Sequence, residues 1–221
     1  MDIFTKLPFN KNFYAALICL PLLAACGSPK DASKANFTKA IDAQLSKRCA
    51  LASFEMTYAS NSTAFPLSIS KIEPGMMLNA EQAKKMDERN FGQYDSAVKA
   101  GLLSAVDAQV KPTIGREGPG KTFSLTEVGK KSLIDPRGTA FCAGHYKVDE
   151  VVNFTEPGNA MGVTISNVTY TFSPVDVPTW ATSDASKAAF PNLAKQLEPK
   201  QQGRATLMLQ NDGWAAQLSI F

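Results

Sequence analysis

Histidine is almost absent from this chain, which contains a single one, His145, among 221 residues. Most hydrolytic triads, proton shuttles and zinc proteases depend on one or more imidazoles, and no H-E-x-x-H pattern occurs here. We therefore expect no enzyme activity, no catalytic residue, no metal site and no cofactor. His145 lies on a segment with strand character, so a hydrogen-bonded or exposed strand histidine is the favoured interpretation.

Cysteine is scarce as well, and the four residues Cys19, Cys26, Cys49 and Cys142 include no C-x-x-C pair. That absence excludes a redox exchange motif and a four-cysteine zinc site.

Long hydrophobic runs and a strong charge of one sign are also missing. The uncharged run from 13 to 25 holds 13 residues, whereas an α-helix needs about 20 to cross the hydrocarbon core of a bilayer. The formal net charge is only +3, so the composition does not require a polyanionic partner.

The N-terminal segment carries a signal-peptide pattern. Lys6 and Lys11 precede the uncharged run, which ends in the small residues of Leu23-Ala24-Ala25-Cys26. This tetrapeptide resembles the lipobox of bacterial lipoproteins. The alternative is a buried N-terminal helix that happens to end in a cysteine.

The lipoprotein resemblance implies removal of residues 1–25 and attachment of diacylglycerol and a further acyl chain, such as palmitate, to Cys26. Several acyl chains hold a protein stably on a membrane without a transmembrane helix. In that class an aspartate after the cysteine favours the inner membrane, whereas Gly27 and Ser28 stand here. The resemblance thus implies lipid anchoring at the outer membrane, facing the periplasm.

Residues 26–35 form a tether rich in Gly, Ser and Pro. After processing, Cys49 and Cys142 are the pair that remains, and an oxidising compartment favours a disulfide between them. The alternative is two buried thiols. Between residues 36 and 78 the apolar spacing predicts a helix from Asn36 to Arg48, with Cys49 on its buried face, and a strand over 50–59.

Residues 79–137 form the next predicted subdomain, and within it 79–134 resemble a winged-helix module. The resemblance rests on a helix start at Asn79, a helix end at Gly101-Leu102-Leu103 and the segment Leu125-Thr126-Glu127-Val128-Gly129-Lys130. It implies one strand, a loose hairpin tip over 115–120 and a closing segment. Winged helices most often bind DNA. The segment is only slightly basic and the chain is expected to be exported, so we expect no nucleic acid and a role in packing or protein docking.

Two further segments match the residue pattern of a catalytic or nucleotide-binding motif but lack the structural context that the motif needs. Residues 115–122 fit the G-x-x-x-x-G-K-[ST] phosphate loop, but Phe123-Ser124-Leu125 predicts a strand where the helix should begin. We therefore expect no nucleotide. Ser68-Ile69-Ser70-Lys71 fits S-x-x-K, but no S-D-N or K-T-G accompanies it.

The alternation of apolar and polar residues over 138–221 predicts an antiparallel sheet with covering helices. The whole chain is therefore assigned to the α+β class. Val148 and Val152 are predicted on one buried face, and a β-bulge is predicted at Ser166-Asn167, where the apolar parity shifts. Two short helical turns are expected over 183–197, separated before Pro191. A tight hairpin is expected over 210–213.

These observations favour a non-catalytic envelope lipoprotein that acts as a protein-interaction or accessory module, with an envelope protein or the cell wall as partner. The alternative is a ligand-binding or inhibitor protein with a cleft between the two subdomains, near Trp180 and Trp214. An enzyme would require a pocket that converges on His145, Asp149 or Glu150.

Overall fold

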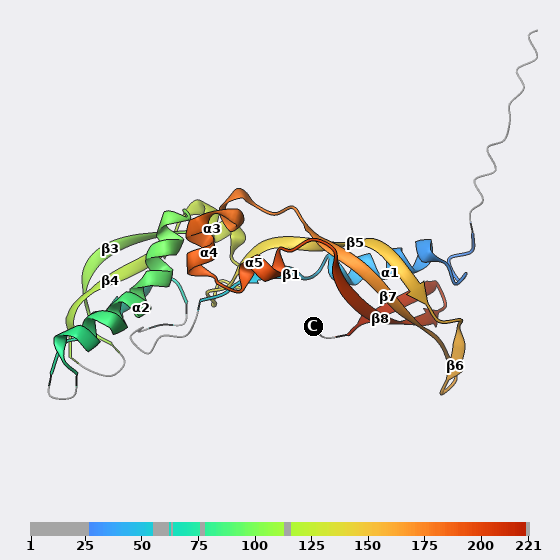
Figure 1. The fold of residues 1–221 in the computed structure, drawn as a ribbon, viewed down its shortest axis with the longest axis horizontal. Helices are drawn as coiled ribbons and strands as arrows, with labels where there is room; N and C mark the ends of the chain where they lie inside the picture. Colours follow the sequence, from blue (N-terminus) through green and yellow to red (C-terminus); the bar gives the residue numbers. More distant parts are fainter. Residues whose placement is uncertain (1–26, 55–61, 63, 76–77, 113–115, 220–221) are drawn as a thin grey trace, which may run out of the picture.

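The computed structural model describes residues 27–54, 62, 64–75, 78–112 and 116–219. It is an elongated molecule with a three-stranded sheet at one end and a six-stranded sheet at the other (Figure 1). All paired strands are antiparallel, which confirms the α+β class. No helix in the described part of the chain has the length and apolar character to cross a membrane. The leader and Cys26 lie outside the described residues.

The six-stranded sheet has the order β1-β5-β7-β8-β9, with β6 paired to β7. The strands are β1 (Cys49–Ala52), β5 (Phe141–Phe154), β6 (Gly158–Ala160), β7 (Val163–Val175), β8 (Gln201–Gln210) and β9 (Gly213–Leu218). Helix α1 (Lys34–Leu45) covers one face of this sheet. The opposite face carries polar side chains such as Asn167 and Arg204. A sheet with one solvated face is common among antiparallel sheets.

Helix α1 packs its apolar stripe on the sheet as the spacing predicted. Phe37, Ala40, Ile41 and Leu45 are buried, and they pack with strand residues such as Tyr170 in one hydrophobic cluster. The Ser33 hydroxyl accepts a hydrogen bond from the Asn36 amide and caps the helix. The predicted end at Arg48 was too late, because the helix ends at Leu45 and Cys49 begins β1.

The predicted β-bulge at Ser166-Asn167 is wrong, because β7 and β8 pair without a register shift from Ile165 to Phe172. The irregularities lie on β5 instead, between Val148 and Glu150 and between Val151 and Asn153. One extra residue reverses the direction of the following side chains. Val151 is therefore only 1% exposed, whereas Val152, predicted to be buried, is 45% exposed.

The three-stranded sheet has the order β2-β4-β3 and consists of β2 (Leu67–Ser70), β3 (Leu103–Val110) and β4 (Gly118–Leu125). Helix α2 (Ala80–Lys99) lies along it (Figure 1). Asn79 and Gln82 form a capping box, which confirms the predicted helix start. Gly101 has a φ of +80°, which lets the chain leave the helix and enter β3.

The elements over 79–134 follow one another as helix, strand, hairpin and closing segment. Thr126 caps the short helix α3 (Glu127–Ser132) by accepting a hydrogen bond from the Gly129 amide. Residues 118–120, expected in a loose hairpin tip, belong to β4, and 113–115 lie outside the described residues. Residues 78–112 contain one long helix and no helix-turn-helix pair. The winged-helix assignment therefore remains a resemblance.

The three-stranded sheet is inserted between two neighbouring strands of the larger one. Strand β1 directly precedes the insertion in the chain and β5 follows it, and these two strands pair with each other. The predicted disulfide between Cys49 and Cys142 is present in the structure, with the Cα atoms 5.3 Å apart. The segment 36–78 thus contributes to both sheets, because β1 and β2 belong to different ones.

A hydrophobic cluster joins the two sheets. It combines Leu67 and Ile69 of β2 with Phe141 of β5 and with residues of the C-terminal half. That half contains the 3-10 turn η1 (Thr179–Thr182) and the short helices α4 (Asp184–Ala189) and α5 (Leu193–Gln196). The two helices confirm the turns predicted over 183–197, and the hairpin predicted over 210–213 joins β8 to β9.

Candidate functional site

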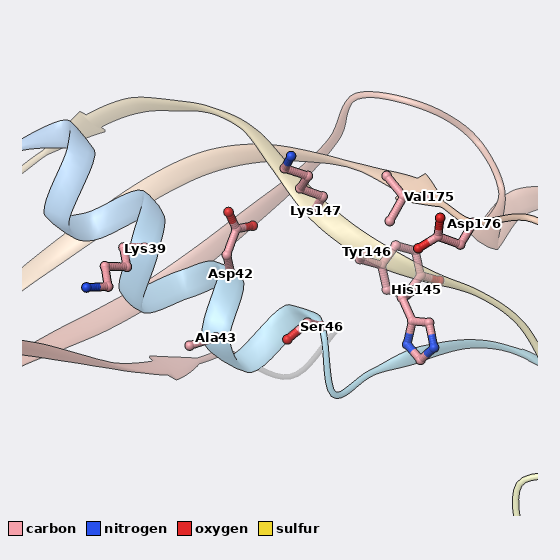
Figure 2. Close-up of a pocket in the computed structure, with 9 residues that line it drawn as sticks. All are labelled: Lys39, Asp42, Ala43, Ser46, His145, Tyr146, Lys147, Val175 and Asp176. Atoms are coloured by element: carbon pink, nitrogen blue, oxygen red, sulfur yellow. The ribbon is translucent and has the colours of Figure 1, made fainter.

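A hollow of about 490 Å³ lies between the C-terminal half of α1 and the part of the larger sheet where β5 passes the end of β7. This size falls within the range of small-molecule sites, roughly 300–1,000 Å³. Figure 2 shows its lining side chains on α1, on β5 and at the end of β7. They are Lys39, Asp42, Ala43, Ser46, His145, Tyr146, Lys147, Val175 and Asp176.

Asp42 holds α1 against the edge of β5. Strand β1 pairs with β5 only as far as His145, so the following part of this edge has no partner strand among the described residues. One oxygen of the Asp42 carboxylate accepts a hydrogen bond of 2.7 Å from the Val148 amide. A side-chain acceptor thus replaces a strand at this position, and the hollow opens beside it.

The hollow combines an apolar floor with charges of both signs. Lys39 and Lys147 contribute two cations, and Asp42 and Asp176 contribute two carboxylates. The Tyr146 hydroxyl donates to the Gln196 carbonyl oxygen at 3.3 Å, and burial raises the pKa of this phenol. Asp176 has a φ of +54°, a conformation in which Asp and Asn are tolerated better than most residues.

His145 lies where the hollow meets the disulfide, and its imidazole points from β5 toward the segment of β1 (Figure 2). Its Nδ1 atom lies 3.2 Å from the Arg48 carbonyl oxygen. The Sγ atoms of Cys49 and Cys142 lie 3.9 Å from Nδ1 and Nε2 respectively. The prediction of a hydrogen-bonded strand histidine is therefore confirmed.

Asp149 and Glu150 do not line the hollow with His145. Asp149 accepts a hydrogen bond of 2.7 Å from the Ser173 hydroxyl. Glu150 forms an exposed ion pair of 3.2 Å with Lys34. Of the three residues named for an enzyme pocket, His145 lines this hollow and the other two do not.

The two tryptophans also lie apart. Trp180 is buried in the cluster that joins the two sheets. Trp214 packs on Phe37 in the other cluster, and its indole N–H donates to the carbonyl oxygens of Lys30 and Asp31 at 3.1 Å. Among the residues that the structure describes, the two tryptophans thus belong to separate clusters and do not line one cleft.

Residues 118–122 of the apparent phosphate loop lie on strand β4. Lys121 and Thr122 lie on β4, where Lys121 forms a 2.8 Å ion pair with Asp95 of α2. The Thr122 hydroxyl lies 2.8 Å from the hydroxyl of Ser68, the serine of the S-x-x-K match, which is on β2. No helix follows Lys121 to direct its amides at a phosphate.

Lys39, Asp42, Ser46 and Asp176 were not predicted as site residues. The helical spacing indicated only the buried face of the helix and gave no reason to select the first three residues, and no local pattern links them to Asp176. The sequence does not show that part of the β5 edge lacks a partner strand. This edge leaves the Val148 amide free to donate to Asp42.

No family model, no curated protein and no solved structure matches this chain.

Proposed function

We propose that this protein is a lipid-anchored lipoprotein of the bacterial cell envelope that acts by binding another envelope component and not by catalysis. The signal-peptide pattern and the lipobox are the evidence for this location, and Cys26 is the residue to which the lipid would be attached. The outer membrane, on its periplasmic side, is the location that Gly27 and Ser28 favour.

The position of the first described residues supports a particular orientation of the molecule on the membrane. The Trp214 indole binds the Lys30 and Asp31 carbonyl oxygens and fixes the chain just before α1. In Figure 1 this start lies at the end of the molecule occupied by α1 and β6, whereas α2, β3 and β4 occupy the opposite end. A lipid on Cys26 then holds the six-stranded sheet near the membrane and presents the three-stranded sheet to the envelope space.

The open edge of β3 is the observation on which the interaction role rests. Strand β3 pairs with β4 on one side, and no described strand pairs with its other side. Val106, in the middle of this edge, is 63% exposed. An exposed edge of eight residues can accept an extended peptide as an additional strand. We infer that an extended segment of an envelope protein binds here.

Site-specific crosslinking tests this proposal. A photoreactive residue at Val106 in the full-length chain is expected to capture a defined protein in intact cell envelopes. The same residue at Val152, which is 45% exposed on the other sheet, is the matched control. Capture of the same proteins from both positions, or of none from Val106, would contradict the proposal. Mass spectrometry of the mature N-terminus tests the lipid on Cys26 separately.

The hollow beside α1 supports a second candidate function, the binding of a small ligand. Its volume and its combination of an apolar floor with two lysines and two carboxylates suit a small amphiphile with charges of both signs. A screen of wall fragments, lipids and metabolites for shifts in melting temperature tests this candidate. A hit is expected to lose its shift in Lys147→Glu and to keep it in Lys187→Glu, because Lys187 is an exposed residue of α4 that does not line the hollow.

A further inference from the structure

Three potential metal ligands lie together where the two sheets meet. They are the Sγ atoms of Cys49 and Cys142 and a ring nitrogen of His145, all within 4.8 Å of one another. The three residues are partly exposed, and they come from the paired strands β1 and β5. The single histidine of the chain thus lies against its disulfide.

The surroundings of His145 fix which nitrogen is available. The Arg48 carbonyl oxygen, 3.2 Å from Nδ1, can only accept a hydrogen bond, so Nδ1 carries the hydrogen. Nε2 then has a free lone pair, and it lies 3.9 Å from the Cys142 sulfur. Metal-binding histidines usually show this arrangement, in which the second ring nitrogen donates to a carbonyl and orients the ring.

The separations also suit a metal ion. With Zn–S bonds of about 2.3 Å and Zn–N bonds of about 2.0 Å, tetrahedral ligands lie roughly 3.5–3.8 Å apart. The Cys142 sulfur lies 3.9 Å from Nε2, already close to this value. The Cys49 sulfur lies 3.9 Å from the other ring nitrogen, and the two sulfurs move apart when their bond is reduced. Two thiolates and one imidazole favour soft ions such as Zn²⁺ and Cu⁺. All three residues are partly exposed, so an ion can reach them from solvent.

We propose that Cys49, Cys142 and His145 bind one thiophilic metal ion when the cysteines are reduced, and that disulfide formation closes this site. Binding of Zn²⁺ releases the two thiol protons. A disulfide-containing oxidant then takes two electrons from the thiolates, the Cys49–Cys142 bond forms, the oxidant becomes two thiolates and Zn²⁺ leaves. A dithiol reductant reverses the step by forming its own disulfide and restoring two thiols. The exchange makes the site a redox-controlled metal carrier.

Titration of the full-length chain with Co²⁺ and Zn²⁺ under anaerobic, phosphine-reduced conditions tests the site. The reduced chain is expected to bind one ion and to show the thiolate-to-Co²⁺ charge-transfer band, which Zn²⁺ removes. Cys49→Ser and Cys142→Ser are expected to lose this band. Cys26→Ser keeps all three ligands and is the matched cysteine control, with binding equal to that of the unchanged chain.

His145→Asn is the sharpest variant, because its amide can still donate to the Arg48 carbonyl while Nε2 is removed. We expect at least a roughly tenfold loss of Zn²⁺ affinity in this variant. Three results would overturn the proposal: no binding by the reduced chain, equal binding by His145→Asn, or the same charge-transfer band from the oxidised chain. If circular dichroism shows that reduction unfolds the chain, Zn²⁺ must restore the folded spectrum, and failure to do so also overturns it.

Discussion

Gly203 and Tyr170 face each other across β8 and β7 and form a tightly packed pair. A Cβ atom at Gly203 would overlap the Tyr170 ring, which is completely buried. The glycine is required here because the ring lies directly over its backbone, and not because of its φ angle. A glycine within a strand often marks such a close approach.

We therefore expect Gly203→Ala to lower the free energy of unfolding by about 1–3 kcal/mol, the usual range for overpacking in a core. Urea unfolding followed by circular dichroism measures this change. Gly158→Ala is the control, since a Cβ there meets nothing within 4 Å. An equal effect of both substitutions would show that Tyr170 does not set the requirement for glycine.

Buried phenols make the fold sensitive to alkali. Burial raises the pKa of both Tyr94 and Tyr170 to about 12, from an ordinary value of 10.0. The unfolded chain therefore loses these protons first, and the stability that depends on them is complete below pH 10 and disappears by about pH 12. We expect the melting temperature to fall across this interval.

The double variant Tyr94→Phe/Tyr170→Phe isolates this effect, because other groups titrate in the same interval. Its melting temperature is expected to fall less steeply than that of the unchanged chain between pH 10 and 12. Parallel curves for the two chains would contradict the assignment. The Tyr170 hydroxyl has no hydrogen-bond partner among the described residues. Its removal therefore does not break a bond.

At the scale of elements, Asp42 connects a helix to a strand edge. Its carboxylate accepts the hydrogen bond of the Val148 amide, and Val148 is buried. We expect Asp42→Ala to destabilise the fold by about 1–3 kcal/mol, because it leaves a buried amide without an acceptor. Asp42→Asn keeps an acceptor oxygen and is expected to cost clearly less. Thermal unfolding compares the two, and equal losses would refute this role of the acceptor.

The sequence predicted most elements because their signals are local. The spacing of Phe37, Ile41 and Leu45 reports the buried face of one helix, and Asn79 with Gln82 reports where another begins. The bulges on β5 were missed because they depend on its pairing with β7 and not on local composition. The same limit applies to the hollow, whose walls come from three distant segments.

At the scale of the whole molecule, the disulfide closes the insertion that contains the three-stranded sheet. Its two cysteines are 93 positions apart in the sequence. For a loop of this length the chain-entropy model gives about 4–5 kcal/mol of stabilisation. We expect Cys49→Ala/Cys142→Ala to lose a stability of this order in chemical unfolding. Cys26→Ala is the control, and a loss from it of similar size would contradict the assignment.

The disulfide pairing was predictable because, after the expected processing of the leader, two cysteines remain. The position of His145 against it was not, because the pairing of β1 with β5 brings together residues 96 positions apart. Cys49 and His145 are opposite each other in that pairing. Long-range register of this kind leaves no trace in a single sequence.

The closed insertion also determines how the molecule responds to proteases. A single cut between residues 50 and 141 leaves both fragments joined through Cys49 and Cys142. The nicked protein would migrate as one band on a denaturing gel without reductant and as two with it. A single cut anywhere in the far end would therefore leave the two pieces covalently joined for as long as the disulfide stays oxidised.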